Sequence, residues 1–393
     1  MALPRFVQIH TLQSYSAALL NRDDSGLAKR LPMGDAIRTR ISSQCLKRHW
    51  RTADDHHSLA RLGVPMAIRS RSTLTMIRDE MIKHDVPENL AQAAAEALRD
   101  AGLLDKGGKS LKGKDALETG QAVLLGKAEV DYLVQRCATL ARECPEEKAL
   151  ASAVAKFLKD EKSNIEALRH GSGLEAALFG RMVTSDVLAS RDAAVYVAHA
   201  FTVHEAQVEN DYFTVVDDLL RETGERGSAG IFDTELASGL YYGYVVVDVP
   251  QLVANLEGIG MAECFDAHPE RRELTGQVVN SLLHLIATVS PGAKRGSTAP
   301  FAHASLMLVE TGDWQPRSLA GAFETALKLK GANIRGQAIG QLAREIEKHD
   351  AAYGAPLDRR YLALDDETPI PKAERLSLDQ LGKWVRNRIV EGA

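Results

Sequence analysis

The sequence predicts an α+β fold, in which a long helical segment interrupts a smaller β-sheet domain. Three observations indicate this arrangement: a strand pattern near the N-terminus, a largely helical stretch from Met66 to about His170, and a strand–helix–strand series between Leu240 and Val309. Strands and helices occur in separate blocks and do not alternate regularly, which favours α+β over a doubly wound α/β fold. With 393 residues, the chain has room for roughly two or three structural units.

The N-terminal part is expected to begin with a strand and to continue through a loop into helices. The strand is expected at Arg5–Leu12, and turn-forming Pro32 and Gly34 lie in the loop that follows, Gln13–Ile37. The elements expected after this loop are an extended stretch at Thr39–Ile41, a helix capped by Ser42 or Ser43 and ending near Arg51, and helices at Met66–Ala101, Lys127–Glu143, Pro145–Asp160 and Ile165–His170.

The pattern changes after Gly171. A buried helix is expected at Ala193–His204, which is mostly apolar, and a protruding hairpin at His204–Ile231, which is polar and contains several glycines. Leu240–Val249 gives the strongest strand pattern, because its residues are aromatic and β-branched. The other expected elements are strands at Ala177–Val183 and Ser305–Val309, and helices at Glu273–Val289, Ser318–Leu329 and Leu378–Ile389.

Composition excludes several classes of protein. Hydrophobic residues make up 45% and charged residues 26% of the chain, as in ordinary folded proteins, so disorder along the whole length is excluded. No apolar stretch approaches the roughly 20 residues of a membrane span, and the N-terminus lacks the apolar region of a secretory signal. The 4 cysteines form no CxxC pair, which argues against a zinc ribbon. We therefore expect a cytoplasmic protein without a cofactor.

Charge is distributed unevenly along the chain. The first 78 residues contain 13 Lys and Arg against 5 Asp, a net charge of +8, whereas the whole chain carries −5. The other 315 residues therefore carry −13. A basic segment on an acidic protein is a reason to look for a polyanionic partner.

The segment Arg38–Arg51 has the pattern of an amphipathic basic helix. Leu46 and Trp50 lie four residues apart on one side, and Lys47 and Arg51 lie four apart on another. The helix start adds backbone N–H groups and polar side chains where an anion could bind, from Ser42, Ser43 and Gln44. Together these features predict a site for backbone phosphates without an element that reads bases. A solvent-facing basic helix, balanced by acids elsewhere, is the alternative.

Two other segments are candidates for nucleic-acid contact. Tyr212 and Phe213 are adjacent aromatic residues in the expected hairpin, and exposed rings can stack on bases of any sequence. Because neighbours on a strand point to opposite faces, one ring could instead return to the core. Lys294 and Arg295, between glycines in a loop, would suit phosphate contact.

Metal chemistry has weaker support. Asp23 and Asp24, next to Arg22, could bind a divalent metal for phosphodiester cleavage, but an Asp pair in a loop more often stabilises turns. His199, His204 and the acids Glu205, Asp217 and Asp218 lack regular metal-ligand spacing. The Walker A, HExxH and GxSxG signatures are absent from the sequence.

Several motifs in order resemble one known family. They are HTL-x₈-NRDD, RTRISSQCLKRHWR, GRMVTS, DYFTVVDDL, SGLYYGYVVVD and PGAKR, and the likeness runs from about Phe6 to Lys383–Arg388. The chain resembles the CasC-type backbone subunit of the type I-E CRISPR Cascade complex. The resemblance implies an RRM-like (ferredoxin-like) palm at 1–57, 171–203 and 233–393, a helical finger insertion at 58–170 and a β-hairpin thumb at 204–232.

The resemblance also implies partners and site residues. Several copies would stack along one CRISPR RNA, with other Cascade subunits, and present it to target DNA, with no membrane involved. Met182 would lie beside a kinked nucleotide, and the thumb aromatics would displace a base. The expected RNA-binding residues are Arg22, Lys29, Arg38, Arg40, Ser42, Ser43, Gln44, Lys47, Arg48, Arg51, Met182, Tyr212, Phe213, Lys294 and Arg295. Target DNA would meet Lys106, Lys109, Lys112 and Lys114.

Two alternatives to a non-enzymatic RNA scaffold remain open. One is a metal-dependent ribonuclease like the backbone subunits of type III complexes, which cut target RNA with a loop aspartate; Asp23 or Asp24 would take that role. The other is an oligomeric structural protein that binds no nucleic acid. Magnesium-dependent cleavage of complementary RNA would favour the first, and the absence of bound RNA after coexpression with a CRISPR array would favour the second.

Overall fold

The computed structural model describes residues 3–101, 117–118, 122–160, 172–181, 191–216, 228–266, 268–293, 295–330, 333–354, 357–364 and 369–392. The chain forms two compact units. The first unit comprises Met1–Ser58, Tyr196–Val247 and Gly276–Ala393, and the second comprises Leu59–Val195 and Asp248–Thr275.

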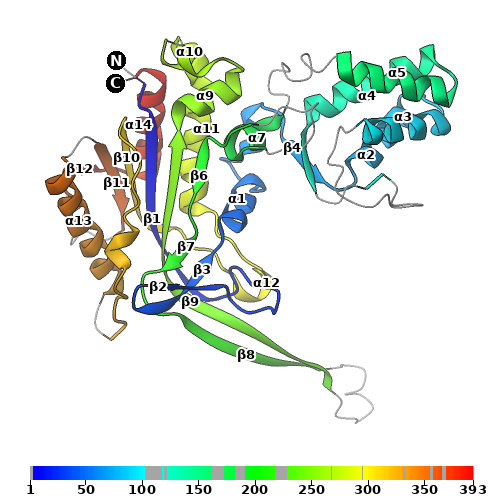
Figure 1. Cartoon of the computed structure of the whole chain (residues 1–393). Coiled ribbons are helices and arrows are strands. Elements are labelled where there is room, and N and C mark those ends of the chain that lie inside the picture. Colours follow the sequence, from blue (N-terminus) through cyan, green and yellow to red (C-terminus); the bar gives the residue numbers. More distant parts are fainter. Residues whose placement is uncertain are drawn as a thin grey trace. The chain divides into compact units, whose positions relative to one another are not determined.

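The first unit contains a mixed β-sheet (Figure 1). Its main strand order is β12-β11-β10-β1-β9-β7-β3-β2; β6 and β8 also pair with β9, and β11 and β12 run parallel. The strands are β1 Phe6–Ala18, β2 Arg30–Met33, β3 Ala36–Ile41, β6 Val195–Val197, β7 Ala200–Thr202, β8 Gln207–Val216, β9 Ser228–Asp248, β10 Ala304–Gly312, β11 Asp358–Ala363 and β12 Ala373–Arg375. The helices are α1 Ser43–Arg51, α11 Pro269–Thr288, α12 Arg295–Thr298, α13 Ile334–Tyr353, α14 Leu378–Val390 and a 3₁₀ turn at Ala320–Phe323.

The two faces of this sheet pack against different helices, because side chains alternate along a strand. Tyr241 of β9 lies in a buried cluster with Tyr15 and Ile41, against which Leu46 of α1 packs. The next residue, Tyr242, lies in another cluster, with Ile339 and Leu342 of α13 among its members. Helices α1 and α13 therefore cover opposite faces of the sheet.

A long antiparallel hairpin extends from this sheet (Figure 1). Strand β8 pairs with the first half of β9, from Gln207 opposite Ser238 to Val216 opposite Ser228. All six residues of β8 from Gln207 to Tyr212 are exposed, so neither face of this part of β8 is covered. The protruding hairpin expected from the polar sequence is confirmed.

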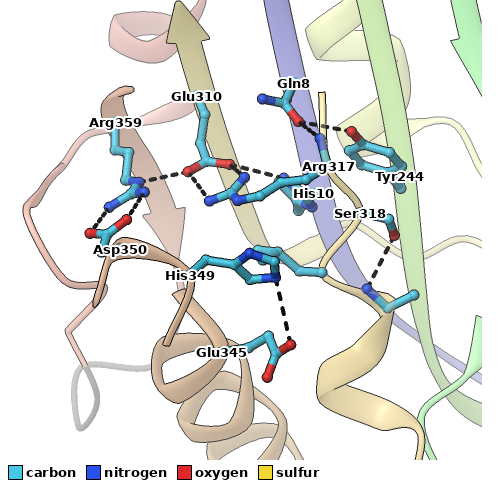
Figure 2. Close-up of polar contacts among 12 residues, drawn as sticks. Gln8, His10, Tyr244, Glu310, Arg317, Ser318, Glu345, His349, Asp350 and Arg359 are labelled. Atoms are coloured by element: carbon cyan, nitrogen blue, oxygen red, sulfur yellow. Dashed lines mark hydrogen bonds and ion pairs between the residues drawn. The ribbon is translucent and has the colours of Figure 1, made fainter. Parts of the chain in front are cut away.

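A buried polar network connects the sheet strands to α13 (Figure 2). Glu310 of β10 accepts hydrogen bonds from Arg317 at 2.6 and 3.0 Å and from Arg359 of β11 at 2.6 Å, and its Oε2 lies 3.2 Å from Nε2 of His10. Arg359 also donates two hydrogen bonds, of 2.6 and 2.7 Å, to the carboxylate of Asp350 on α13. Burial raises the pKa of Glu310, but hydrogen bonds from His10 and Arg317 lower it well below its usual range. The carboxylate is therefore ionised and paired.

The second unit is mainly helical and has its own core. The hydrophobic core joins helices α2 to α5 through buried residues such as Ile77, Leu98, Leu133 and Val154. Its elements are a 3₁₀ turn at Leu59–Leu62, β4 Ala67–Ser70, α2 Thr73–Lys83, α3 Glu88–Asp100, β5 Val123–Gly126, α4 Lys127–Glu143, α5 Glu147–Asp160, α7 Gly173–Phe179, α9 Val249–Glu257 and α10 Met261–Asp266. None of the helices in the described parts of the chain is long and apolar enough to cross a membrane.

The structure confirms the α+β class and corrects five expected elements, the fifth being the start of the helical stretch expected from Met66, where strand β4 (Ala67–Ser70) precedes α2. The expected helix at Ala193–His204 is wrong: this apolar run forms the short strands β6 and β7. The expected strand at Ala177–Val183 is wrong in part: it overlaps helix α7, which ends at Phe179 and is followed by Gly180 as C-cap with φ +79°. The expected loop at Gln13–Ile37 is wrong in part, because β1 continues to Ala18 and β2 pairs with β3.

The fourth correction concerns Ser318–Leu329, where only the 3₁₀ turn Ala320–Phe323 forms. The backbone of this segment bonds to other parts of the unit: Ala326 N–H donates to Asp35 at 2.8 Å, and Leu327 N–H donates to the Val203 carbonyl at 3.0 Å. Gly34, in the turn before Asp35, has φ +60°, and a Cβ there would lie 1.7 Å from the Glu324 carbonyl oxygen. Tertiary contacts therefore replace the helical hydrogen bonds that local sequence predicts.

Candidate nucleic-acid interface

Helix α1 has the two sides that its sequence predicts. Ser42 is the N-cap, and its Oγ accepts a hydrogen bond of 3.3 Å from the backbone N–H of Cys45. Trp50 is buried, and Leu46 packs on the cluster beside β1 and β9. Arg48 is exposed on the other side of the helix. The apolar side therefore anchors α1 to the sheet unit and the basic side faces solvent.

The start of α1 is largely occupied by the protein itself. The N–H of Ser42 donates to Oδ1 of Asn21 at 2.9 Å, and the N–H of Ser43 donates to Nδ1 of His199 at 3.1 Å. The N–H of Cys45 bonds to the Ser42 hydroxyl. Since three of these N–H groups have acceptors within the protein, the prediction that they are open to an anion is wrong. Within the described residues, only the Gln44 N–H of these first positions has no acceptor. The buried Ser42 hydroxyl is a cap and not an RNA contact.

Four cations from separate segments gather around α1. Arg48 of α1, Lys29 from the loop before β2 and Arg295 of α12 all act electrostatically on the Cys45 thiol. Arg40 of β3 acts with Lys29 on His199. We call Lys29, Arg40, Arg48 and Arg295 the α1 cluster. The segments are held together by backbone contacts such as Arg40 N–H to the Lys29 carbonyl, 2.7 Å.

The α1 cluster has no carboxylate partners among the described residues. Its side chains bond only to uncharged groups: Arg40 lies 3.5 Å from Nδ1 of His199, and Arg295 donates to the Ser290 carbonyl at 3.1 Å. Arg48 is exposed and Lys29 is half-buried. Unpaired cations at this density form a positive patch that would attract a polyanion.

The cations of the α1 cluster lower the pKa of neighbouring titratable groups. Burial lowers the pKa of His49, and Arg295 and Arg48 lower it further. Its Nε2 accepts the Gly292 N–H at 3.3 Å, and its Nδ1 donates to the Cys45 carbonyl at 2.8 Å, so the ring joins α1 to the loop before α12. Burial raises the pKa of the Cys45 thiol, and the nearby cations oppose this rise.

Three more predicted contacts flank the cluster. Arg22 is exposed and its backbone forms an antiparallel bridge with Ala28. Arg51 is half-buried at the end of α1. Lys47 is also half-buried, and burial lowers its pKa. These three residues lie on the segments that carry Lys29 and Arg48.

Arg38 corrects the prediction. Its side chain is fully buried and donates to the carbonyls of Thr202 at 3.2 Å and Phe323 at 3.0 Å. Burial lowers the pKa of this guanidinium, and Asp35 at 3.6 Å opposes that shift. Arg38 therefore joins β3 to β7 and the 3₁₀ turn and is not an RNA contact. Its neighbour Arg40 carries the charge on that strand.

Tyr212 is an exposed aromatic side chain on the hairpin. Its exposed fraction is 63%, and it lies opposite Asp233 in the β8–β9 register. Two residues along, Asn210 lies opposite Glu235, so Tyr212 and Glu235 share one face of the hairpin. Glu235 accepts the N–H of Ala28 at 2.8 Å and pairs with Arg30. The face that carries Tyr212 is therefore the face that bonds to the Lys29 segment.

Several predicted residues lie outside the described part of the chain. They are Met182, the Phe213 side chain, Lys294, and the proposed DNA contacts Lys106, Lys109, Lys112 and Lys114. Their predicted roles stay predictions.

The possible metal ligands have other partners. Asp23 Oδ1 accepts the N–H groups of Ser25 at 3.0 Å and Leu27 at 2.9 Å, as expected for a carboxylate that stabilises a turn. His204 accepts the Leu240 N–H at Nε2 and donates from Nδ1 to the Glu205 carbonyl. Within the described residues, no group of three or more His, Cys, Asp or Glu could hold a metal ion.

Sequence reasoning did not predict the roles of Asn21, His49 and His199 at α1: Asn21 was noted only within the NRDD motif and His199 only as a possible metal ligand. Each holds part of α1 through a contact with a residue distant in sequence, and His199 lies in a segment expected to be helical. No local motif indicates that these residues hold α1. The loop position of Asn21, directly before the Arg22-Asp23-Asp24 run, was the nearest signal.

Comparisons with known proteins agree with the fold and the motifs. Among curated proteins, none matches this chain. A chain of a solved "CRISPR RNA-guided surveillance complex, pre-nicking" is 28% identical, with a TM-score of 0.79 over 98% of this chain and 100% of that one. A chain of another solved "CRISPR RNA-guided surveillance complex" has a TM-score of 0.68 and 24% identity over 99% and 100%, and supports the fold alone.

The family assignment rests on a match that spans most of the chain. Residues 7–386 match the model of the family Cas_CT1975, described as CT1975-like protein. The protein therefore belongs to the CT1975-like family of Cas proteins, which confirms the resemblance to CasC-type Cascade backbone subunits expected from its motifs.

Proposed function

We propose that the protein is a CRISPR RNA-binding backbone subunit of a Cascade surveillance complex, and that the α1 cluster holds the RNA backbone. The observation that carries the proposal is the gathering of Lys29, Arg40, Arg48 and Arg295 without a carboxylate partner among the described residues. A group of cations without carboxylate partners creates a positive potential that attracts a polyanion. The 28% identical chain comes from an RNA-guided complex, which supports RNA as that anion.

The chemistry of the cluster suits contact with phosphates of any guide sequence. Lysine and arginine on a helix, a strand and a loop can follow a phosphate backbone, and contacts of this kind fix position but carry no sequence information. In RNA-guided complexes, sequence is read by base pairing, so the protein needs only a backbone grip. The cluster fits that requirement.

Tyr212 adds a contact of another kind. An exposed ring on the hairpin can stack on a base of any sequence. Since its face of the hairpin bonds to the segment of Lys29 through Glu235, the ring and the cluster would meet the same strand. We propose that this stacking displaces a base at intervals along the guide.

The finer organisation is part of the same proposal. The sheet would be an RRM-like palm, the segment 58–170 a helical finger and the hairpin at 204–232 a thumb, with several copies along one guide RNA. Other Cascade subunits and target DNA, held through the guide, would be the remaining partners. No catalytic step is proposed, because the Asp23 carboxylate accepts two N–H groups of its own turn.

The proposal can be tested by coexpression with a CRISPR array and the other subunits, followed by sequencing of the copurified RNA. The test variant is Lys29→Ala with Arg48→Ala. Its matched control is Arg344→Ala with Lys348→Ala, which removes the same number of positive charges, from exposed positions of α13 on the opposite face of the sheet. We expect the control to retain guide RNA as the unsubstituted protein does, and the test variant to lose most of it at raised salt.

Two results would contradict the proposal. If the unsubstituted complex contains no guide RNA, the function is wrong. If Lys29→Ala with Arg48→Ala retains as much full-length guide RNA as its control, RNA binding is not at the α1 cluster. Magnesium-dependent cutting of complementary RNA that is abolished by Asp23→Ala would instead support the ribonuclease alternative.

A further inference from the structure

We propose that Phe301 is a base-stacking contact for RNA beside the α1 cluster, with its ring on a nucleobase while Arg295 binds a neighbouring phosphate. The inference rests on the proposed RNA binding at the α1 cluster and adds one residue to that site. It differs from the contacts of the cluster because the ring carries no charge and stacks on a base of any sequence.

Phe301 lies in the loop between α12 and β10 with its ring in solvent. Its exposed fraction is 74%, the highest of any large hydrophobic side chain in the part of the chain that the structure describes. Single exposed hydrophobic residues are common on protein surfaces. The role of this ring is therefore decided by how it is held and by what surrounds it.

Both neighbours of the ring in sequence are fixed to the protein. Pro300 is buried and packs on Gly292, where a Cβ would lie 2.6 Å from Cγ of Pro300. The N–H of Ala302 donates to Oγ of Ser290 at 2.9 Å, and the Ala302 carbonyl accepts hydrogen bonds from Ser290 at 3.0 Å and from Gln13 at 2.6 Å. The backbone therefore holds the ring outward between two anchored residues.

The same contacts place the ring beside the α1 cluster. The carbonyl of Ser290, the residue that holds Ala302, accepts a hydrogen bond of 3.1 Å from Arg295. Ala302 also packs on the buried cluster against which Cys45 and Leu46 of α1 pack. The loop of Phe301 and helix α1 consequently lie against one part of the core, on the same face of the sheet.

The combination of groups in this loop suits a single nucleic-acid strand. Arg295 is exposed, and among the described residues its guanidinium bonds to a carbonyl and not to a carboxylate. Proteins that bind single strands combine cations along the backbone with aromatic rings on which the bases stack. Arg295 and Phe301 supply one group of each kind from one short loop. An apolar contact with a second copy of the chain is the alternative, and such a contact does not require an aromatic ring.

Three substitutions separate stacking from an apolar contact. Phe301→Ala removes the ring, Phe301→Leu keeps an apolar side chain without a ring, and Phe301→Trp keeps a ring. We expect Phe301→Ala and Phe301→Leu to weaken the binding of a short single-stranded RNA about tenfold, which is within the usual range for one base–aromatic stack. Phe301→Trp should bind as the unsubstituted chain does. Since the position is exposed, none of the three should lower Tm.

The matched control is Tyr353→Ala. Tyr353 of α13 is also an exposed ring, with an exposed fraction of 68%, and α13 packs on the face of the sheet opposite α1. This control should keep full RNA affinity. None of these variants removes a charge, so the slope of log K against log salt should not change.

Photochemical crosslinking reports the stacked ring directly. A single-stranded RNA that carries 5-iodouridine crosslinks on irradiation to aromatic rings in contact with the base. The full unsubstituted chain should give a crosslinked peptide that contains Phe301, and mass spectrometry should find no such crosslink in Phe301→Leu. The absence of this crosslink in the unsubstituted chain would contradict the proposal.

The remaining outcomes distinguish this inference from the proposed function. If Phe301→Leu keeps full affinity while Phe301→Ala loses it, the ring makes an apolar contact and base stacking is refuted. If Phe301→Ala binds RNA normally while Lys29→Ala with Arg48→Ala weakens binding, only the role of Phe301 is wrong. If Lys29→Ala with Arg48→Ala also binds normally, the proposed function itself fails at this site.

Discussion

The guanidinium of Arg38 donates a hydrogen bond of 3.0 Å to the carbonyl oxygen of Phe323, 285 positions away in sequence. A second bond of 3.2 Å goes to the Thr202 carbonyl, and the side chain is fully buried. Arg40, two residues along β3, is half-buried and lies in the α1 cluster. Residues two apart on a strand point to the same face, so the carbonyls that surround Arg38, and not the strand direction, give the two arginines different roles.

We predict that Arg38→Ala destabilises the protein without acting on RNA directly. The substitution leaves buried carbonyls unpaired and should lower the free energy of unfolding by about 3 kcal/mol. Arg48→Ala, at an exposed position, should change it by less than about 0.5 kcal/mol. Urea denaturation of both variants measures the difference. Unchanged stability together with lost RNA binding in Arg38→Ala would refute the structural role.

Sequence predicted the helix of the site well but not the exposure of every basic residue. The spacing of Leu46 and Trp50 indicated which side of α1 is buried, and Ser42 was one of the two caps expected, with Ser43. Exposure of Arg38 could not be predicted, because its partners are carbonyls from distant segments. The contact of His199 with α1 could not be predicted for the same reason, because its partner Ser43 is 156 positions away.

Tyr212 should contribute affinity by stacking. Tyr212→Ala is expected to weaken single-stranded RNA binding by about 1–3 kcal/mol, since that is the usual range for one base–aromatic stack. Tyr212→Trp should preserve or strengthen binding, and neither change should alter the salt slope, because no charge is removed. Fluorescence titration at several salt concentrations measures the affinity of each variant and its salt slope. Equal affinity of Tyr212→Ala and the unsubstituted chain would show that the ring does not contact RNA.

Glu310 should be essential for stability. Glu310→Gln removes the charge that pairs Arg317 and Arg359, and breaking a buried ion pair costs about 3–5 kcal/mol. Glu374→Gln is the control, since Glu374 pairs with Arg360 while its own side chain is 63% exposed. Chemical denaturation compares the two variants. A small loss for Glu310→Gln, similar to that of the control, would contradict the ionised state of the buried network.

Stability should fall in mild acid because of His284. Its ring stacks on His57 at 3.6 Å between centroids. Burial is the main cause that lowers the pKa of His284 from 6.5 to about 4, and the neighbouring His57 is the second. The unfolded ring binds a proton below about pH 6.5 while the folded ring does not, so stability is full above that pH and decreases toward pH 4. The expected contribution at pH 5 is a loss of about 2 kcal/mol.

His284→Gln tests this assignment. The variant should lose less stability than the unsubstituted protein between pH 7 and pH 5, by about 2 kcal/mol. His268→Gln, at an exposed position, is the control and should keep the original pH dependence. Thermal or urea unfolding at both pH values gives the comparison. An unchanged pH dependence in His284→Gln would show that this ring does not cause it.

The α+β class followed from the order of strand and helix patterns, but short apolar segments were assigned less well. Ala193–His204 has too few polar residues to show a helical or strand period, so its two short strands were not predicted. Strand β1 continued past Leu12 because β10 and β9 pair with it, which no local pattern indicates. Pairing partners distant in sequence decided both segments.

The most direct test of the account is the salt dependence of single-stranded RNA binding by the Lys29→Ala, Arg48→Ala double variant. Loss of two phosphate contacts should reduce the slope of log K against log salt by about 1.4. The Arg344→Ala, Lys348→Ala control, with the same change in net charge, should keep the slope of the unsubstituted protein. Equal slopes for the two double variants would contradict an RNA backbone grip at α1.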